Sequence, residues 1–230
     1  MKLASSTETK TATDFTNNMD EHLLRFDKEK EYVFIDCETL NLCLHYCHNL
    51  PWQIAMIKAR GDNKFDEKDF FIKWDTDLKI SDDAARITRF DQKVIDRKGV
   101  APEEIFPTMK DWLDNADYIV GHNILGFDIY LIKEYYKMMG ESVDHLYEKI
   151  IDTHSVAKGY KLSLPYKQGD SFLEYQYMAA HKRKKGVKTS LSALGKEFDI
   201  DHDYGKLHNA LVDLELNLKV WNKLKWNVEV

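Results

Sequence analysis

The sequence predicts one α/β domain, and three stretches carry this prediction. Residues 32–35 form a short run of β-branched and aromatic residues, which is typical of a buried strand. Residues 118–120 form a second such run and lead into a helical pattern. The C-terminal stretch has apolar residues at helical spacing, namely Leu211, Leu214, Leu218, Trp221 and Leu224. A chain of 230 residues with 43% hydrophobic content can bury one substantial core.

Two carboxylates follow the first predicted strand. Asp36 and Glu38 are two residues apart, so an extended strand directs both side chains to the same face. Buried like charges raise each other's pKa, and such a pair stays ionised only if a cation neutralises it. Oxygen ligands of this kind suit magnesium or manganese. Taken alone, however, an Asp-x-Glu pair at a strand end is more often structural than a metal site.

Two more acidic residues and one histidine stand at predicted helix starts. Asp128 follows Gly-His-Asn at 121–123 and Phe127, in a buried turn that opens a helix, where the helix dipole favours a negative side chain. Asp213 lies one turn inside the C-terminal helix, and His208 lies just ahead of it. A histidine at a helix entrance can accept a proton near neutral pH. Taken singly, each of these residues also fits a cap or a solvated surface position.

Together and in this order, the three patterns resemble the DEDD superfamily of 3′-to-5′ exonucleases, of the proofreading-subunit and RNase T type. The resemblance extends from about residue 31 to about residue 224. Weaker matches are a second strand at 51–57, an Ile-Thr turn at 87–88, an Asp-Thr strand end at 151–153 and a Ser-Leu helix at 190–194. The resemblance implies an RNase H-like fold, with a mixed central sheet flanked by helices, over residues 31–230.

The resemblance also implies roles for individual residues. The histidine branch of the superfamily has its histidine five positions before the last aspartate, and here that position is His208; the tyrosine of the other branch would stand at Asn209. His208 would be the general base. Two magnesium or manganese ions would be bound by Asp36, Glu38, Asp128 and Asp213, and the 3′-terminal nucleotide would be received by Thr39, the backbone of Leu40, Leu42 and Asn123.

The sequence departs from the family pattern in two places. Leu40 and Asn41 stand where many members have Thr-Gly, which predicts a different turn beside the terminal sugar. Three residues, 124–126, separate Asn123 from Phe127, where the histidine branch usually has two. This longer spacing resembles the exonuclease domains of some viral, including phage, and replicative polymerases, and it raises a question about the geometry around Asp128.

A basic segment precedes the last motif, although the net charge of the chain is −6. Residues 158–188 contain eight Lys or Arg and two acidic residues, with tyrosines interleaved. Such a run usually forms a solvated loop. A basic arm with aromatic residues also suits phosphate contacts and base stacking, and we therefore expect substrate contacts from Lys182, Arg183, Lys184 and Lys185.

The three cysteines, Cys37, Cys43 and Cys47, fall within eleven residues of one another and lie beside His45 and His48. A zinc site built from residues 43–48 is one interpretation. We favour reduced cysteines in a loop beside the active site, because structural zinc sites usually pair two separated ligand couples. In this loop Tyr46 and Trp52 could stack on bases, but Trp52 follows a strand-like proline and fits the core better.

The remaining expectations concern the ends of the chain and its environment. Residues 1–30 form a polar tail, disordered at its start and with a short helix possible at 21–26. The chain has no apolar stretch of membrane-spanning length and no apolar signal core, so we expect a soluble, cytoplasmic protein, in the host cytoplasm if the chain is viral.

The function expected from these patterns is hydrolysis of single-stranded nucleic acid from its 3′ end. A replication polymerase or other replication proteins would be possible partners. One alternative is an RNA-specific, oligoribonuclease-like enzyme, since the sequence does not choose between DNA and RNA. Another is a non-catalytic nucleic-acid-binding or polymerase-tethering module, against which the retention of all five catalytic-type residues argues. A third is a zinc-binding interaction protein built on the cysteine cluster.

Overall fold

The computed structural model describes residues 23–44, 49–75 and 79–230, and its centre is a five-stranded sheet in the order β3-β2-β1-β4-β5. β1 (Glu31–Thr39) pairs antiparallel with β2 (Pro51–Arg60), which pairs antiparallel with β3 (Asn63–Phe71). On its other side β1 runs parallel to β4 (Tyr118–Gly121), and β4 runs parallel to β5 (Ile150–Asp152). The predicted mixed sheet is therefore confirmed.

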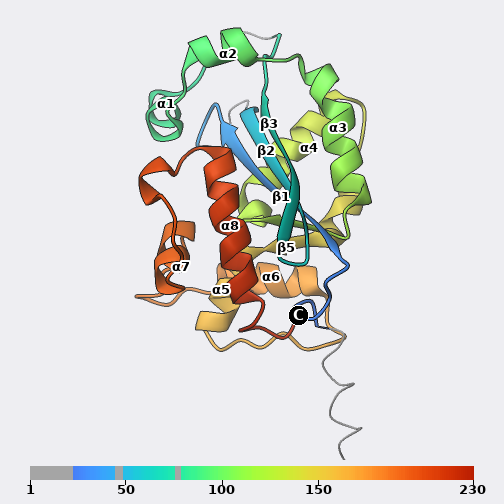
Figure 1. Ribbon diagram of the computed structural model, residues 1–230, viewed down its shortest axis with the longest axis vertical. Helices are drawn as coiled ribbons and strands as arrows, with labels where there is room; N and C mark the ends of the chain where they lie inside the picture. Colours follow the sequence, from blue (N-terminus) through green and yellow to red (C-terminus); the bar gives the residue numbers. More distant parts are fainter. Residues whose placement is uncertain (1–22, 45–48, 76–78) are drawn as a thin grey trace, which may run out of the picture.

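Helices cover both faces of this sheet (Figure 1). α3 (Pro102–Asn115) and α4 (Asp128–Met138) pack on one face, where Val33 and Ile35 of β1 point. α8 (Ala210–Leu224) packs on the other face, against Phe34 and the alternate residues of β2. Because successive side chains of a strand point to opposite faces, and both faces are covered, β1 has to be apolar almost throughout, as residues 32–35 are.

Shorter helices complete the domain. α1 (Asp82–Thr88) and α2 (Gln92–Lys98) connect β3 to α3, and α5 (Thr153–Lys161) follows β5 and packs on α6 (Phe172–His181). α7 (Leu191–Glu197) packs on α8. Single 3₁₀ turns, η1 (Ile124–Gly126), η2 (Asp144–Lys149) and η3 (Tyr204–Lys206), precede α4, β5 and α8. Among the described residues, no helix is long and apolar enough to cross a membrane.

The packed part of the chain begins earlier than the predicted boundary at residue 31. Leu23 and Leu24 are buried, and the Leu24 amide donates to the Val230 carbonyl at 2.8 Å. Residues 24–26 form a turn instead of the expected helix; residues 21 and 22 of that helix and the start of the tail lie outside the described residues. Two leucines in a polar stretch give too weak a pattern to predict this packing against the C-terminus.

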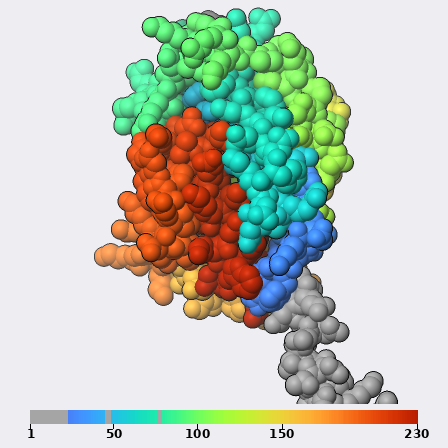
Figure 2. Space-filling model, in the orientation of Figure 1, coloured from blue at the N-terminus to red at the C-terminus, as the bar shows by residue number. Residues whose placement is uncertain are grey.

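The topology brings the sequence motifs to one edge of the sheet. β1, β4 and β5 are parallel, so their carboxyl ends lie at the same edge. The N-terminus of α8 also reaches this edge, and α8 lies beside β3 on the face shown in Figure 2, where Glu215 pairs with Lys64 at 3.3 Å. Ligands bind at such carboxyl ends in many α/β folds.

Candidate active site

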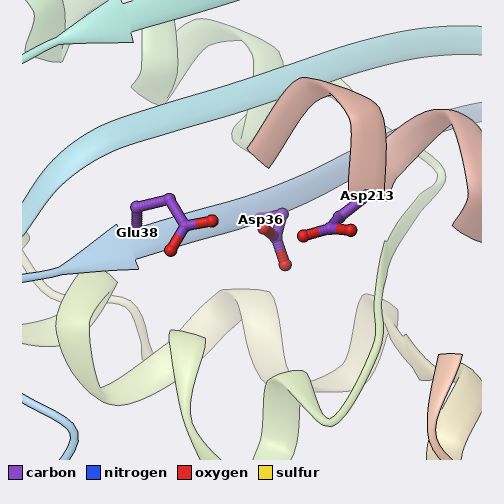
Figure 3. Close-up of side chains that lie close together, drawn as sticks. All are labelled: Asp36, Glu38 and Asp213. Atoms are coloured by element: carbon purple, nitrogen blue, oxygen red, sulfur yellow. The ribbon is translucent and has the colours of Figure 1, made fainter. Parts of the chain in front are cut away.

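Three carboxylates converge at the carboxyl end of β1 (Figure 3). Asp36 and Glu38 project from the same face of β1 because they are two residues apart, and Asp213 projects towards them from the first turn of α8. Each offers one oxygen, and these oxygens lie within 4.8 Å of one another. The fold thus brings together Asp36 and Asp213, which are 177 positions apart in the sequence.

Asp128 is the first residue of α4 and lies behind this group. It is buried, and its Oδ1 accepts a hydrogen bond from the Cys37 amide at 3.1 Å, between the two acidic residues of β1. The extra residue in the loop before it is taken up by η1, which leaves Asp128 at the helix start. A Cβ at Gly126 would lie 2.5 Å from Oδ1 of Asn123, so glycine at this position leaves the exposed Asn123 side chain in its place.

Burial raises the pKa of all four carboxyl groups, and repulsion from the neighbouring carboxylates adds to the effect at Asp36 and Glu38. Burial raises the pKa of Asp36 well above its ordinary value, and the charges of Asp128, Asp213 and Glu38 add to the effect. Burial, with the charges of Asp213 and Asp128, raises the pKa of Glu38 to about 8. Burial also raises the pKa of Asp128 to about 7 and that of Asp213 to about 6.

This electrostatic arrangement fits a bound divalent cation. Within residues 23–44, 49–75 and 79–230, none of the ion pairs involves these four carboxylates, so no lysine or arginine of these ranges is paired with them. Buried carboxylates without a positive partner are costly, and a hard divalent ion with oxygen ligands removes that cost. The residues present therefore suit magnesium or manganese.

His208 stands at the rim of the carboxylate group. Its side chain is exposed, and its amide donates to Oδ2 of Asp213 at 3.0 Å. Its φ of 69° is in the left-handed region, which non-glycine residues seldom adopt. Such backbone conformations persist where the surrounding structure holds them and are common at active sites. Asn209, the next residue, caps α8 by accepting from the Val212 amide.

The turn expected to receive the 3′-terminal nucleotide is held from inside by Asn49. The Asn49 amide oxygen accepts from the Thr39 hydroxyl and from the Asn41 amide, and its nitrogen donates to the Asn41 carbonyl at 2.6 Å. The Leu40 amide donates to the Leu50 carbonyl, and the Leu40 carbonyl accepts from Ser81. Thr39 and Leu40 are thus engaged in hydrogen bonds within the protein.

Two other predicted substrate residues are accessible. The Leu42 side chain is 45% exposed, and Asn123 is exposed with φ of 65° at the start of η1. A residue not predicted for the site, Asp152, fixes this loop: its carboxylate accepts from the amides of Asn123, Leu125 and Ser155 at 3.0–3.2 Å. The signal available in the sequence was the position of Asp152 at the end of a predicted strand.

The basic segment forms a concave surface of its own. Lys182, Arg183, Lys184 and Lys185 line a pocket of about 400 Å³, together with Lys158 of α5. α5 follows β5, so this pocket lies on the β5 side of the carboxylate group. Trp52 is buried in the core as favoured, whereas His45, Tyr46, Cys47 and His48 lie outside the described residues, and with them the zinc interpretation and the stacking role of Tyr46.

Comparison with known proteins places the chain in a family. Residues 33–221 match the family model described as "Exonuclease" and named RNase_T, so the chain belongs to this exonuclease family. Membership makes the protein a hydrolase of the 3′-to-5′ exonuclease class, a class that depends on divalent metal ions, and the acidic triad at Asp36, Glu38 and Asp213 is present. No curated protein sequence matches the chain.

Solved structures of E. coli exonuclease I have the same fold. The complex with a dA16 oligonucleotide matches with a TM-score of 0.67 and 17% identity over 86% of this chain and 41% of that one. The complex with a dT13 oligonucleotide matches with a TM-score of 0.66 and 18% identity, over 86% of this chain and 41% of that one. The zinc-bound complex with single-stranded DNA matches with a TM-score of 0.64 and 19% identity, over 83% of this chain and 39% of that one. The chain thus spans about two fifths of exonuclease I.

Proposed function

We propose that this protein removes nucleotides one at a time from the 3′ end of single-stranded DNA and releases nucleoside 5′-monophosphates. The observation that carries this proposal is the convergence of three carboxylate oxygens within 4.8 Å at the end of β1, with Asp128 behind them. The oligonucleotide complexes of exonuclease I support DNA as the substrate. An RNA substrate remains the alternative, because a 2′-hydroxyl can be read by any polar group.

The four carboxylates would hold two divalent ions, which lower the pKa of an attacking water and stabilise charge on the attacking and leaving oxygens. Asp36 and Glu38 present oxygens from β1, and Asp213 presents its own from α8. The Asp213 carboxylate also accepts from the backbone amide of His208, which holds this residue beside the carboxylates. His208 would take the proton from the attacking water as general base.

The remaining residues would position the 3′ end of the single-stranded nucleic acid. Leu42 and Asn123, both exposed beside the site, would contact the terminal nucleotide, and Asn49 would hold the turn of Thr39 and Leu40 in shape. A non-catalytic binding module would not need a histidine in a left-handed conformation beside a buried group of carboxylates. For this reason we favour the enzyme.

A free 3′-hydroxyl should be required for digestion. The turn at Leu40–Leu42 is closed from inside by the Asn49 network, so the site suits a chain terminus better than a continuous strand. We expect a linear single strand to be digested at least about tenfold faster than the same strand with a 3′-phosphate, because the added phosphate would occupy the space in which the terminal 3′-hydroxyl is received. Circular single strands should resist cleavage. Rapid cutting of circles would identify an endonuclease and contradict the proposed polarity.

The basic segment should contribute binding without chemistry. Changing Lys182, Arg183, Lys184 and Lys185 to alanine removes up to four phosphate contacts, and on single strands each contact contributes about 0.7 to the slope of log K against log salt. Affinity for a labelled oligonucleotide should fall and this slope should flatten, while turnover at saturating substrate changes little. The control is a variant in which four exposed lysines outside the basic segment are changed to alanine, namely Lys79, Lys93, Lys133 and Lys223. An unchanged slope would show that the segment is only a solvated loop.

A further inference from the structure

A second concave site lies beside His208, on the opposite side from the basic segment. It has a volume of about 400 Å³, within the range of about 300–1,000 Å³ that small-molecule sites occupy. Its walls come from the N-terminal end of α8, the β2–β3 edge of the sheet and α2. In the sheet order β3-β2-β1-β4-β5, Asp36 and Glu38 stand on the central strand β1, with this site on the β2–β3 side of them.

The walls of this site, which we call the β2–β3 pocket, are positively charged around an apolar base. Arg89, Lys98 and Lys206 line it, and Asp91 is the acidic residue among them. The Asp91 carboxylate is directed to the helix end, where it accepts from the Lys93 amide at 2.9 Å. The aromatic ring of Phe71 lies under the Lys98 ammonium at 5.2 Å. Cations above aromatic and aliphatic side chains suit a phosphate attached to a base.

Long-range contacts hold this pocket in place beside the catalytic histidine. Arg89 donates to the Gly205 carbonyl at 2.9 Å, which joins the end of α1 to the loop before His208. Gln53, in the pocket wall, is paired with Glu38 in the β1–β2 register and donates to Asp69 at 2.7 Å. The pocket therefore begins one strand away from the carboxylates and shares His208 with them.

We propose that the β2–β3 pocket binds the released nucleoside 5′-monophosphate through its phosphate. This proposal rests on the proposed function, because it takes its ligand from that reaction. If the single-stranded nucleic acid lies along the basic segment, on the β5 side of the carboxylates, the β2–β3 side has to accommodate only the one nucleotide that is released. The product carries a phosphomonoester of charge about −1.5 to −2. Lys206 is paired with Asp203 at 3.0 Å, so Arg89 and Lys98, which belong to none of the described ion pairs, would attract this phosphate.

The test is binding of thymidine 5′-monophosphate to the metal-free protein. The pocket contains none of the four carboxylates, so binding there does not need a metal ion, whereas binding at the catalytic centre does. We expect the ³¹P resonance of the nucleotide to shift on addition of protein in excess chelator, and thymidine, which has no phosphate, not to compete. Changing Arg89 and Lys98 together to alanine should weaken binding by about tenfold or more, as expected for loss of charged hydrogen bonds.

Two further variants sharpen the test. Lys93→Ala removes a charge from the same helix α2 outside the pocket, and binding should be unchanged. Val94→Trp fills the pocket without removing a cation and should also weaken binding, which separates occlusion from a general charge effect. Circular dichroism checks that each variant is folded.

Kinetics with the metal-loaded enzyme give a second measurement. The single variant Lys98→Ala, which keeps the Arg89 contact with the loop before His208, should show about tenfold weaker inhibition by thymidine monophosphate, with the KM for a dT oligonucleotide changed less than about twofold. A KM that rises in parallel would assign the pocket to the substrate strand and overturn the proposal, as would absence of binding in chelator. If the wild-type protein is inactive but still binds the nucleotide in chelator, the proposed function is contradicted. The assignment of the β2–β3 pocket as a nucleotide-binding site would still hold.

Discussion

Replacing Glu38 by glutamine should abolish turnover and at the same time raise the melting temperature of the metal-free protein at pH 9. Burial and the charges of Asp213 and Asp128 raise the pKa of Glu38 to about 8 from an ordinary value of 4.5. The folded state therefore binds the proton more tightly than the unfolded state does. The contribution of Glu38 to the free energy of unfolding is therefore fully present below pH 4.5 and is lost as the pH rises to about 8. It is lost because burial and the neighbouring charges oppose ionisation only in the folded state.

The glutamine side chain of Glu38→Gln avoids this loss of folding stability because it has no acidic proton to release. Thermal melts in chelator at pH 5 and pH 9 should show little difference at pH 5 and a higher melting temperature for Glu38→Gln at pH 9, by about 2–4 °C per kcal/mol regained. Turnover should fall by at least about a thousandfold, because a metal ligand is worth several kcal/mol of transition-state stabilisation. Addition of magnesium should stabilise the wild type more than the variant.

Glu134→Gln is the matched control for this experiment. Glu134 is exposed on α4 and pairs with Lys137 at 3.7 Å, away from the four carboxylates. Its replacement should leave turnover, the pH dependence of stability and the magnesium effect unchanged. A lower melting temperature for Glu38→Gln at pH 9 in chelator would mean that the carboxylates do not repel one another in the folded protein.

Replacing His208 by alanine should lower turnover by about a hundredfold or more while leaving metal binding intact, because a general base acts mainly in the transition state. The contact that holds Asp213 comes from the His208 backbone amide, which alanine retains. Magnesium should therefore stabilise His208→Ala as it stabilises the wild type. Asp213→Asn, by contrast, removes a ligand charge and should lose that stabilisation.

The pH dependence of turnover gives an independent measurement on His208. If His208 is the general base, wild-type turnover should have an ascending limb in its pH profile that the alanine variant lacks. His145→Ala is a suitable control, since His145 is 47% exposed and pairs with Asp114 far along the chain from the motifs. Near-normal turnover of folded His208→Ala in saturating magnesium would remove this residue from the mechanism.

The positions of three candidate site residues, Asp36, Glu38 and Asp213, were predictable because each follows a strong local pattern. Residues 32–35 leave no reasonable alternative to a buried strand, and the two-residue spacing then places Asp36 and Glu38 on one face. The apolar periodicity from Leu211 onward likewise places Asp213 in the first turn of α8. The family order supplied what local pattern could not, namely that these two elements meet at the same edge of the sheet.

The supporting residues were not predictable because their roles depend on contacts between distant segments. Asn49 acts across ten residues on Thr39 through the connection between β1 and β2, and Asp152 acts on the loop before Asp128 across the β4–β5 pair. Arg89 meets Gly205, 116 positions later. None of these contacts leaves a periodic or spaced pattern in the sequence, and the same holds for the packing of Leu24 against Val230.

Digestion of a single-stranded oligonucleotide labelled at its 5′ end, in magnesium and in excess chelator, tests the central claim most directly. The buried carboxylates at the end of β1 predict a ladder that shortens from the 3′ end by single nucleotides in magnesium, release of nucleoside monophosphates, and no digestion in chelator. Matched DNA and RNA strands would reveal the preferred sugar in the same experiment. Equal digestion in chelator, or internal fragments without a ladder, would contradict a metal-dependent 3′-to-5′ exonuclease.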